Sequence, residues 1–147
     1  MDDVGKSARQ PLVAYWALRI ALGVVPIVAG LDKFANLLAD WTTYLSPLVA
    51  RLSPVSPENF MRAAGVIEVV VGAAILLGHA RVFAWIAAAW LAAIALQLLT
   101  SGHFFDIAAR DAVMATAAFA LARLAEVAER APARDRAVDA RPASARA

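Results

Sequence analysis

The residues that could do chemistry in this chain are ionisable side chains placed inside long apolar stretches. Arg19 interrupts one such stretch, Glu68 lies within another, and Asp111 stands at the start of a third. An ionisable group in apolar surroundings is costly, so it usually faces the protein interior, has a partner and marks a functional position. These three residues are therefore candidates for a buried polar network.

Helical spacing predicts that two of these charges point towards neighbouring helices. Arg19 shares a helix face with Gly23, and Glu68 shares one with Gly72, because residues four apart lie on the same side of a helix. Glycines allow a second helix to approach closely. Counting the helical rise from opposite ends puts Arg19 and Glu68 at similar depth, so we predict an ion pair between them. Two interpretations stay open: a structural pair that fixes helix register, and a proton or ligand site.

A second polar group gathers where the predicted helices reach the outer side of the membrane. One interpretation is a polar pocket that opens outwards beneath the segment around Trp41. The other is ordinary interface anchoring and helix capping. Together with the first pair, the predicted ligand-binding or buried polar network consists of Arg19, Asp32, Lys33, Trp41, Tyr44, Glu68, Gln97, Arg110 and Asp111.

Several kinds of chemistry are not expected. The chain has no cysteine, which excludes a thiol redox pair, cysteine-bound zinc and cysteine-held iron–sulfur clusters. His79 and His103 fall at opposite ends of the predicted helices, so they cannot ligate one haem. We therefore predict no catalytic and no metal-ligating residue, and a protein that is not catalytic alone. A net charge of only +2 and the lack of a soluble basic domain argue against nucleic acid as a partner.

The elements that must position these side chains are four apolar segments. The chain is 62% hydrophobic and only 18% charged, whereas soluble domains are nearer half apolar and a quarter charged. Lipid is the solvent that suits such a composition. We predict an all-α polytopic membrane protein with a bundle of four transmembrane helices, at about residues 11–31, 57–77, 82–99 and 106–128.

The segments around these helices also have predicted roles. Residues 1–10 form a polar lead-in to the membrane domain 11–130, and residues 131–147 form a tail that we expect to be disordered. Apolar residues at helical spacing over Leu31–Leu45 predict a short interfacial helix between the first and second spans. A packed loop is the alternative for this segment.

Basic residues predict the orientation of the bundle. With the amino terminus inside, the outer side carries only the basic residues Lys33, Arg51, Arg62 and Arg110, while the lead-in, the His79–Arg81 turn and the tail carry the majority. Basic residues concentrate on the cytoplasmic side of membrane proteins. We therefore expect both termini in the cytoplasm and a bacterial-type inner (plasma) membrane location.

Short motifs in the chain resemble the DoxX-like family of small membrane proteins. The resemblance covers roughly residues 12–125 and implies a compact four-helix membrane bundle. The matching positions are Arg19 with Gly23, the run Ala29–Phe34, Glu68 with Gly72, and Leu76–Gly78. Relatives include the membrane subunit of an archaeal thiosulfate:quinone oxidoreductase, and others are linked to oxidative-stress complexes.

The resemblance implies a function as a membrane accessory subunit or scaffold of a respiratory or stress-response oxidoreductase. A second hypothesis is a quinone- or lipid-binding redox protein, with the headgroup near Arg19 and Glu68 or near Asp32, Lys33 and Arg110. Without cysteine, its electrons would have to come from a partner or a bound cofactor. A third is a small proton-coupled transporter, which would need to form a homo-oligomer because four helices are few. The expected partners are thus the bilayer, an oxidoreductase and a second copy of the chain.

Overall fold

The computed structural model describes the backbone of residues 2–139 and the side chains of residues 12–129. This part of the chain is all-helical, without a strand. Its elements are α1 (Asp2–Ala35), the 3-10 turn η1 (Trp41–Tyr44), α2 (Pro47–Leu52), α3 (Pro57–Ala74), the π-helical segment η2 (Ile75–His79), α4 (Ala80–Thr100) and α5 (Phe105–Asp139).

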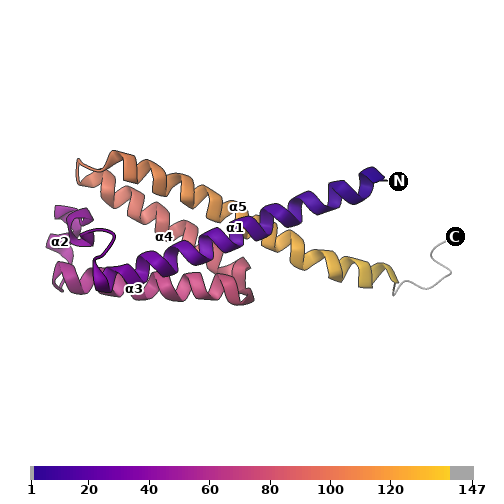
Figure 1. The fold of residues 1–147 in the computed structure, drawn as a ribbon, viewed down its shortest axis with the longest axis horizontal. Coiled ribbons are helices and arrows are strands. Elements are labelled where there is room, and N and C mark those ends of the chain that lie inside the picture. Colours follow the sequence, from indigo (N-terminus) through magenta and orange to yellow (C-terminus); the bar gives the residue numbers. More distant parts are fainter. Residues whose placement is uncertain (1, 140–147) are drawn as a thin grey trace.

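The four long helices form two antiparallel pairs (Figure 1). Helix α1 packs mainly on α3, and α4 packs mainly on α5, while the contacts between the two pairs are less extensive. The chain reverses between α3 and α4 at Gly78, whose φ of 113° suits glycine because it lacks a Cβ atom. We call this end of the bundle the Gly78 end, and the opposite end, where α2 lies, the α2 end.

Glycines set the register of α1 against α3. A Cβ atom added to Gly30 would lie 2.5 Å from the backbone oxygen of Gly65, and one added to Gly65 would lie 2.5 Å from that of Gly30. Towards the Gly78 end, a Cβ atom added to Gly72 would meet the backbone oxygen of Gly23, whereas one added to Gly23 would meet the Leu76 side chain. The two backbones therefore touch at two points, as small residues permit between membrane helices.

The packing is inverted relative to that of a water-soluble protein. Most of the buried apolar residues are alanines, whereas large apolar side chains are exposed along all four long helices. Examples are Val28 of α1, Val70 of α3, Leu96 of α4 and Val113 of α5. Small residues inside and large apolar residues outside are what helices in lipid require.

Two helical stretches are long and apolar enough to cross a membrane, Leu12–Ala35 and Pro57–Thr100. The second stretch contains the reversal at Gly78 and so comprises both α3 and α4. Helix α5 does not qualify because charged residues flank its apolar centre, with Arg110 and Asp111 on one side and Arg123 on the other. Four membrane spans therefore stay a prediction.

The connection between α1 and α3 differs from the helix predicted over Leu31–Leu45. Helix α1 continues to Ala35, and Asn36 then adopts a φ of 50°, a conformation that ends helices. The Asp32 carboxylate accepts hydrogen bonds from the backbone amides of Leu37 and Leu38, which stops the helical pattern. The short helix in this connection is instead α2, and the preceding Trp41 segment is a packed turn.

The amino-terminal end of α1 and the carboxyl-terminal end of α5 also differ from the predicted bounds. Helix α1 starts at Asp2, within the predicted lead-in, and α5 runs to Asp139, into the tail expected to be disordered. Alanine and arginine, which dominate the segment after residue 128, have high helix propensity, and this explains the longer helix. Residues 140–147 of the predicted tail lie outside the described residues.

Candidate functional site

A buried ion pair lies near the α2 end of the bundle. The Lys33 Nζ of α1 is 2.6 Å from the Glu68 Oε2 of α3, and the two side chains are only 6% and 10% exposed. The same Nζ lies 3.8 Å from the centre of the Trp41 ring of η1, a cation–π contact. An ammonium held away from water by a carboxylate and an aromatic ring joins three elements at one point.

Asp32 holds the Trp41 ring in this position. The indole Nε1 of Trp41 donates a hydrogen bond of 2.7 Å to the Asp32 Oδ2, and the amides of Leu37 and Leu38 also donate to this carboxylate. Asp32 is itself buried, so its charge depends on these donors. One side chain thus ends α1 and fixes the aromatic cover over Lys33.

Helix α5 contributes a further buried acid, Asp111. Its only hydrogen-bond partner among the described residues is Arg110, at 3.4 Å between Nε and Oδ1, and Arg110 is 62% exposed while the Asp111 side chain is 8% exposed. Lys33 makes its ion pair with Glu68, and its charge reaches Asp111 only at longer range. We call Asp32, Lys33, Trp41, Glu68 and Asp111 the Lys33 cluster.

Gln97 connects the Trp41 segment to the second helix pair. Its Nε2 donates to the backbone oxygen of Tyr44 at 2.9 Å, and its Oε1 accepts from the backbone amide of Ser46 at 3.0 Å. Ser46 is fully buried and caps α2 by accepting from the Val49 amide. The sequence analysis missed Ser46, although Ser46-Pro47 repeats the Ser-Pro helix start seen at Ser56.

The predicted Arg19–Glu68 ion pair is wrong. Arg19 donates from Nε to the backbone oxygen of Ile75 and from Nη2 to that of Leu76, each at 2.9 Å. Its guanidinium therefore caps the carboxyl-terminal end of α3, where unpaired carbonyls and the helix dipole attract a cation. Arg19 and Lys33 are about 21 Å apart along α1, so Glu68 cannot reach both.

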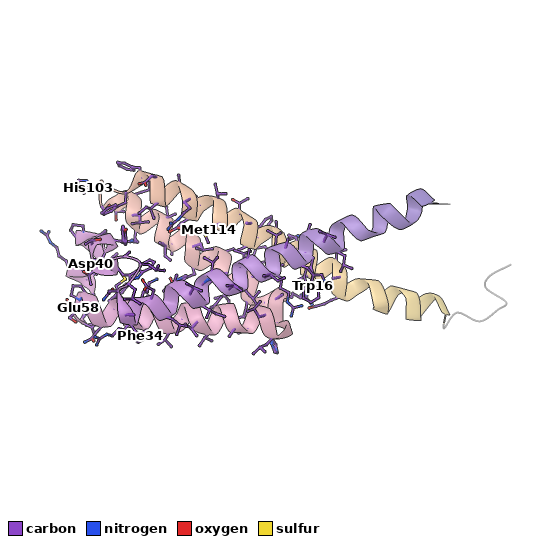
Figure 2. The ribbon with its side chains drawn as sticks, in the orientation of Figure 1. Trp16, Phe34, Asp40, Glu58, His103 and Met114 are labelled. Atoms are coloured by element: carbon purple, nitrogen blue, oxygen red, sulfur yellow. The ribbon has the colours of Figure 1, made fainter. Side chains whose placement is uncertain are left out.

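The two ends of the bundle therefore carry separate polar groups. The Arg19 guanidinium carbon lies 4.8 Å from the ring of Trp16, and Figure 2 places Trp16 far from Phe34 and Asp40 at the α2 end. Of the nine predicted site residues, the Lys33 cluster brings together Asp32, Lys33, Trp41, Glu68 and Asp111. Tyr44 and Gln97 bond to each other beside it, Arg110 borders it, and only Arg19 lies elsewhere.

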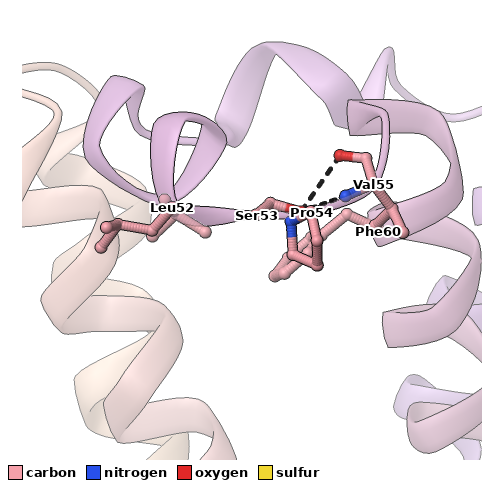
Figure 3. A pocket seen from close by; sticks show the side chains of 6 residues that line it. Leu52, Ser53, Pro54, Val55 and Phe60 are labelled. Atoms are coloured by element: carbon pink, nitrogen blue, oxygen red, sulfur yellow. Dashed lines mark hydrogen bonds between the residues drawn. The ribbon is translucent and has the colours of Figure 1, made fainter.

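A shallow apolar depression of about 310 Å³ lies between α2 and the start of α3 (Figure 3). Val49, Leu52, Pro54 and Phe60 are among the residues that line it, and none of its lining residues belongs to the Lys33 cluster. Being open and apolar, it is a surface feature that suits lipid chains, and it does not expose the buried charges.

One further polar atom needs an explanation. The indole Nε1 of Trp90 on α4 is buried and has no hydrogen-bond partner among the described residues. Trp90 lies seven residues before Gln97, on the same helix face, so it sits about two turns deeper in the bundle.

Within the described part of the chain, no group of three His, Asp or Glu side chains is placed to hold a metal ion.

Comparison with known proteins gives one match. The family model described as DoxX matches residues 14–103, a range that contains Arg19 and every member of the Lys33 cluster except Asp111. No curated protein and no solved structure matches the chain.

Proposed function

The chain belongs to the DoxX family, and on this premise we propose that it is an integral membrane accessory subunit, or scaffold, of a respiratory or stress-response oxidoreductase. As a member of that family it is a membrane protein, and the bilayer is its environment. The topology we propose has four spans with both termini in the cytoplasm of a cell with a bacterial-type inner membrane.

The shape of the bundle supports four spans. Helices α3 and α4 run in opposite directions on either side of Gly78, so the long apolar stretch from Pro57 to Thr100 crosses the membrane twice. Helix α5 has 35 residues and is therefore about 52 Å long, well above the roughly 30 Å of a hydrocarbon core. Its exposed Val113 and Phe119 present an apolar surface to lipid.

The observation that carries the scaffold proposal is the engagement of the buried basic side chains in joining helices. Arg19 connects α1 to the end of α3, and Lys33 connects α1 to the middle of α3. In membrane proteins, polar groups facing the interior act either as framework or as part of a substrate path. Side chains committed to backbone carbonyls and a short ion pair favour a framework, on which a catalytic partner assembles.

The test is to isolate the protein with its partners. The tagged full-length chain, expressed at native level and extracted in mild detergent, should give by native mass spectrometry a stoichiometric complex with a protein that carries a flavin, haem or iron–sulfur absorption spectrum. An unrelated four-helix membrane protein with the same tag is the control. Two results together contradict the proposal. The chain is recovered only as a monomer or homo-oligomer, and membranes from cells that lack this protein have the same quinone-reductase activity as membranes that contain it.

The unpartnered Trp90 N–H favours a second candidate, a quinone- or lipid-binding protein. A quinone carbonyl or lipid ester oxygen is an acceptor that this buried donor lacks. The binding site would lie between Trp90 and the α2 end, near Asp32, Lys33 and Arg110, because Arg19 and Glu68 do not meet. Solvent extraction of the purified protein should then release one quinone or lipid per chain. Trp90→Phe, which removes the N–H, should lose it, and Trp16→Phe at an exposed position should keep it.

A further inference from the structure

The apolar surface of α5 is much shorter than that of α1. On α5 it lies between Arg110 and Arg123, whose side chains are 62% and 59% exposed. These residues are thirteen positions apart in the sequence, so their Cα atoms are separated by about 20 Å along the helix. The apolar stretch of α1, Leu12–Ala35, has 24 residues and extends over about 36 Å. A hydrocarbon core is about 30 Å thick, so α1 is long enough to cross it and the apolar part of α5 is too short.

The side chains between the two arginines present an apolar surface to the outside of the bundle. Val113, one turn after Arg110, is 70% exposed, and Phe119, one turn before Arg123, is 47% exposed. Each shares a helix face with its neighbouring arginine, because residues three or four apart lie on the same side of a helix. Where α5 meets lipid, both guanidinium groups must therefore extend out of the hydrocarbon to the headgroups.

At the Gly78 end of this surface, Arg123 has a carboxylate partner. Its Nη1 lies 2.7 Å from the Oε2 of Glu126, one turn nearer the carboxyl terminus. The Oε1 of Glu126 accepts a hydrogen bond of 3.3 Å from the Nε1 of Trp85 on α4. Trp85 is exposed, and tryptophan is enriched at membrane interfaces. These contacts draw the Arg123 guanidinium out of the apolar region and neutralise its charge.

At the α2 end, Arg110 has donors to spare. Its Nε lies 3.4 Å from the Asp111 Oδ1, and its other guanidinium N–H groups have no hydrogen-bond partner among the described residues. The five N–H donors of a guanidinium form a fork that matches a phosphate. Helical side chains lean towards the amino terminus of their helix, which in α5 is the α2 end. Arg110 is therefore directed out of the apolar region, with a charge that complements an anion.

We propose that Arg110 binds the phosphate of a phospholipid in the outer leaflet, and that the bilayer is thinner beside α5 than beside α1. The apolar part of α5 is about 10 Å shorter than the hydrocarbon core, and extended arginines together with local thinning of the bilayer make up this difference. Lipid is the occupant that fits this face, because a cation at the end of an apolar strip complements a phosphate that carries acyl chains. The proposal rests on α5 spanning the membrane, as in the topology proposed above, and needs no oxidoreductase partner.

The depth of single spin labels tests the local thickness. The chain has no cysteine, so the full-length protein can carry one label at Val113→Cys or Phe119→Cys on α5, or at Val28→Cys on α1, all exposed positions. In phosphatidylcholine nanodiscs, collision rates with oxygen and with a water-soluble nickel chelate give the depth of each label. The Val113 label should lie close to the phosphates, and adding Arg110→Leu should move it deeper. The Val28 label should keep its depth.

The control is Arg51→Leu, which removes an exposed arginine of α2 and should leave the Val113 label where it was. A Val113 label that is deep in the wild type, or that does not move in Arg110→Leu, overturns the proposal and leaves the four-span topology intact. Equal access of the nickel chelate to the Val113 and Phe119 labels shows that α5 does not cross the membrane, and it overturns both. If Arg110→Leu does not fold, Arg110→Met must move the label in the same way.

Two further outcomes concern the occupant of this face. Low collision rates with both reagents at Val113 show that a second copy or another protein covers α5, and they overturn lipid as the occupant. The phosphate itself is tested by melting the protein in phosphatidylcholine and in a phosphate-free diglucosyl lipid with the same acyl chains. The wild type should melt at a higher temperature in the phospholipid, and Arg110→Leu should reduce this difference while Arg51→Leu retains it. Equal reduction in the two variants overturns the assignment of the phosphate to Arg110.

Discussion

At the scale of single residues, the strongest constraint is that neither member of the Lys33–Glu68 pair can be removed alone. Glu68→Ala leaves the Lys33 ammonium buried without a carboxylate in direct contact, and we expect a loss of about 3–5 kcal/mol in stability. Replacing both partners by methionine should restore much of this loss, because no unpaired charge then remains in the bundle. Apparent melting temperatures from fluorescence-detected size-exclusion chromatography measure the difference.

The matched control is Glu58→Ala, an acid on the same helix whose exposed position at the start of α3 should make it nearly neutral. If Glu68→Ala melts like Glu58→Ala, the pair is not a buried framework contact. If the double methionine variant is no more stable than either single variant, the loss does not come from an uncompensated charge.

A separate prediction concerns Arg19. Because its Nε and Nη2 bond two different carbonyls of α3, lysine cannot replace it, and Arg19→Lys should lower the melting temperature nearly as much as Arg19→Met. The loss should be about 1.5–3 kcal/mol, typical of hydrogen bonds to charged groups. The effects of Arg19→Met and Glu68→Gln should add in the double variant, since distant sites do not couple. A strong coupling between these variants contradicts the separation of the two residues.

The sequence indicated which polar side chains gather in the bundle better than it indicated their pairing. Eight of the nine predicted residues lie in or beside the Lys33 cluster, because ionisable groups in apolar helices must turn inwards. The error in pairing Arg19 with Glu68 came from estimating depth by counting from assumed helix ends. The glycine contacts give the register of α1 against α3 more accurately. Matching Gly30 with Gly65 and Gly23 with Gly72 places Arg19 opposite residue 76, where it is found.

At the scale of secondary-structure elements, the close approach of α1 and α3 predicts an ordered series of glycine substitutions. Gly30→Ala and Gly65→Ala each drive a methyl group to 2.5 Å from a backbone oxygen, which cannot move aside. The Cβ of Gly23→Ala meets only the Leu76 side chain, which can rotate. We expect losses of about 1–3 kcal/mol for the first two and a smaller loss for Gly23→Ala, measured by thermal unfolding in the same detergent.

Gly23→Ala serves as the internal control, since it lies on the same helix face as Gly30 and adds the same methyl group. Val66→Ala, at an exposed site next to Gly65, should have little effect. Equal losses for Gly23→Ala and Gly30→Ala are incompatible with a backbone-to-backbone contact at Gly30.

Helix boundaries followed from the sequence only where a local signal encodes them. Ser56 caps α3 and Gly78 reverses the chain, as serine before proline and glycine after an apolar run predict. The end of α1 has no such local signal, because it depends on Asp32 accepting the amides of Leu37 and Leu38 and holding Trp41. Periodicity cannot reveal a side chain that competes with the helix for backbone hydrogen bonds.

At the scale of the whole molecule, the division into two helix pairs gives the polar residues different tasks. Contacts within a pair use glycine, alanine and charged caps, whereas the pairs are linked near the α2 end through the Trp41 segment, which bonds to both Asp32 and Gln97. Towards the Gly78 end, Leu22, Val71 and Ile75 share one apolar core with Leu121 and the alanines of α4 and α5. The two pairs are therefore joined at both ends of the bundle.

The proposed topology leads to a prediction that the cysteine-free chain makes simple to test. Single cysteines are introduced at exposed positions: Val55→Cys before α3, His103→Cys before α5, and His79→Cys at the reversal. A membrane-impermeant maleimide added to intact cells should label the first two, because the loops at the α2 end face outwards. His79→Cys should react only after permeabilisation, since basic residues retain the Gly78 end in the cytoplasm. If His79→Cys is labelled in intact cells, the orientation is the opposite of the one proposed. If His103→Cys is protected while Val55→Cys is labelled, α4 and α5 do not both span the membrane.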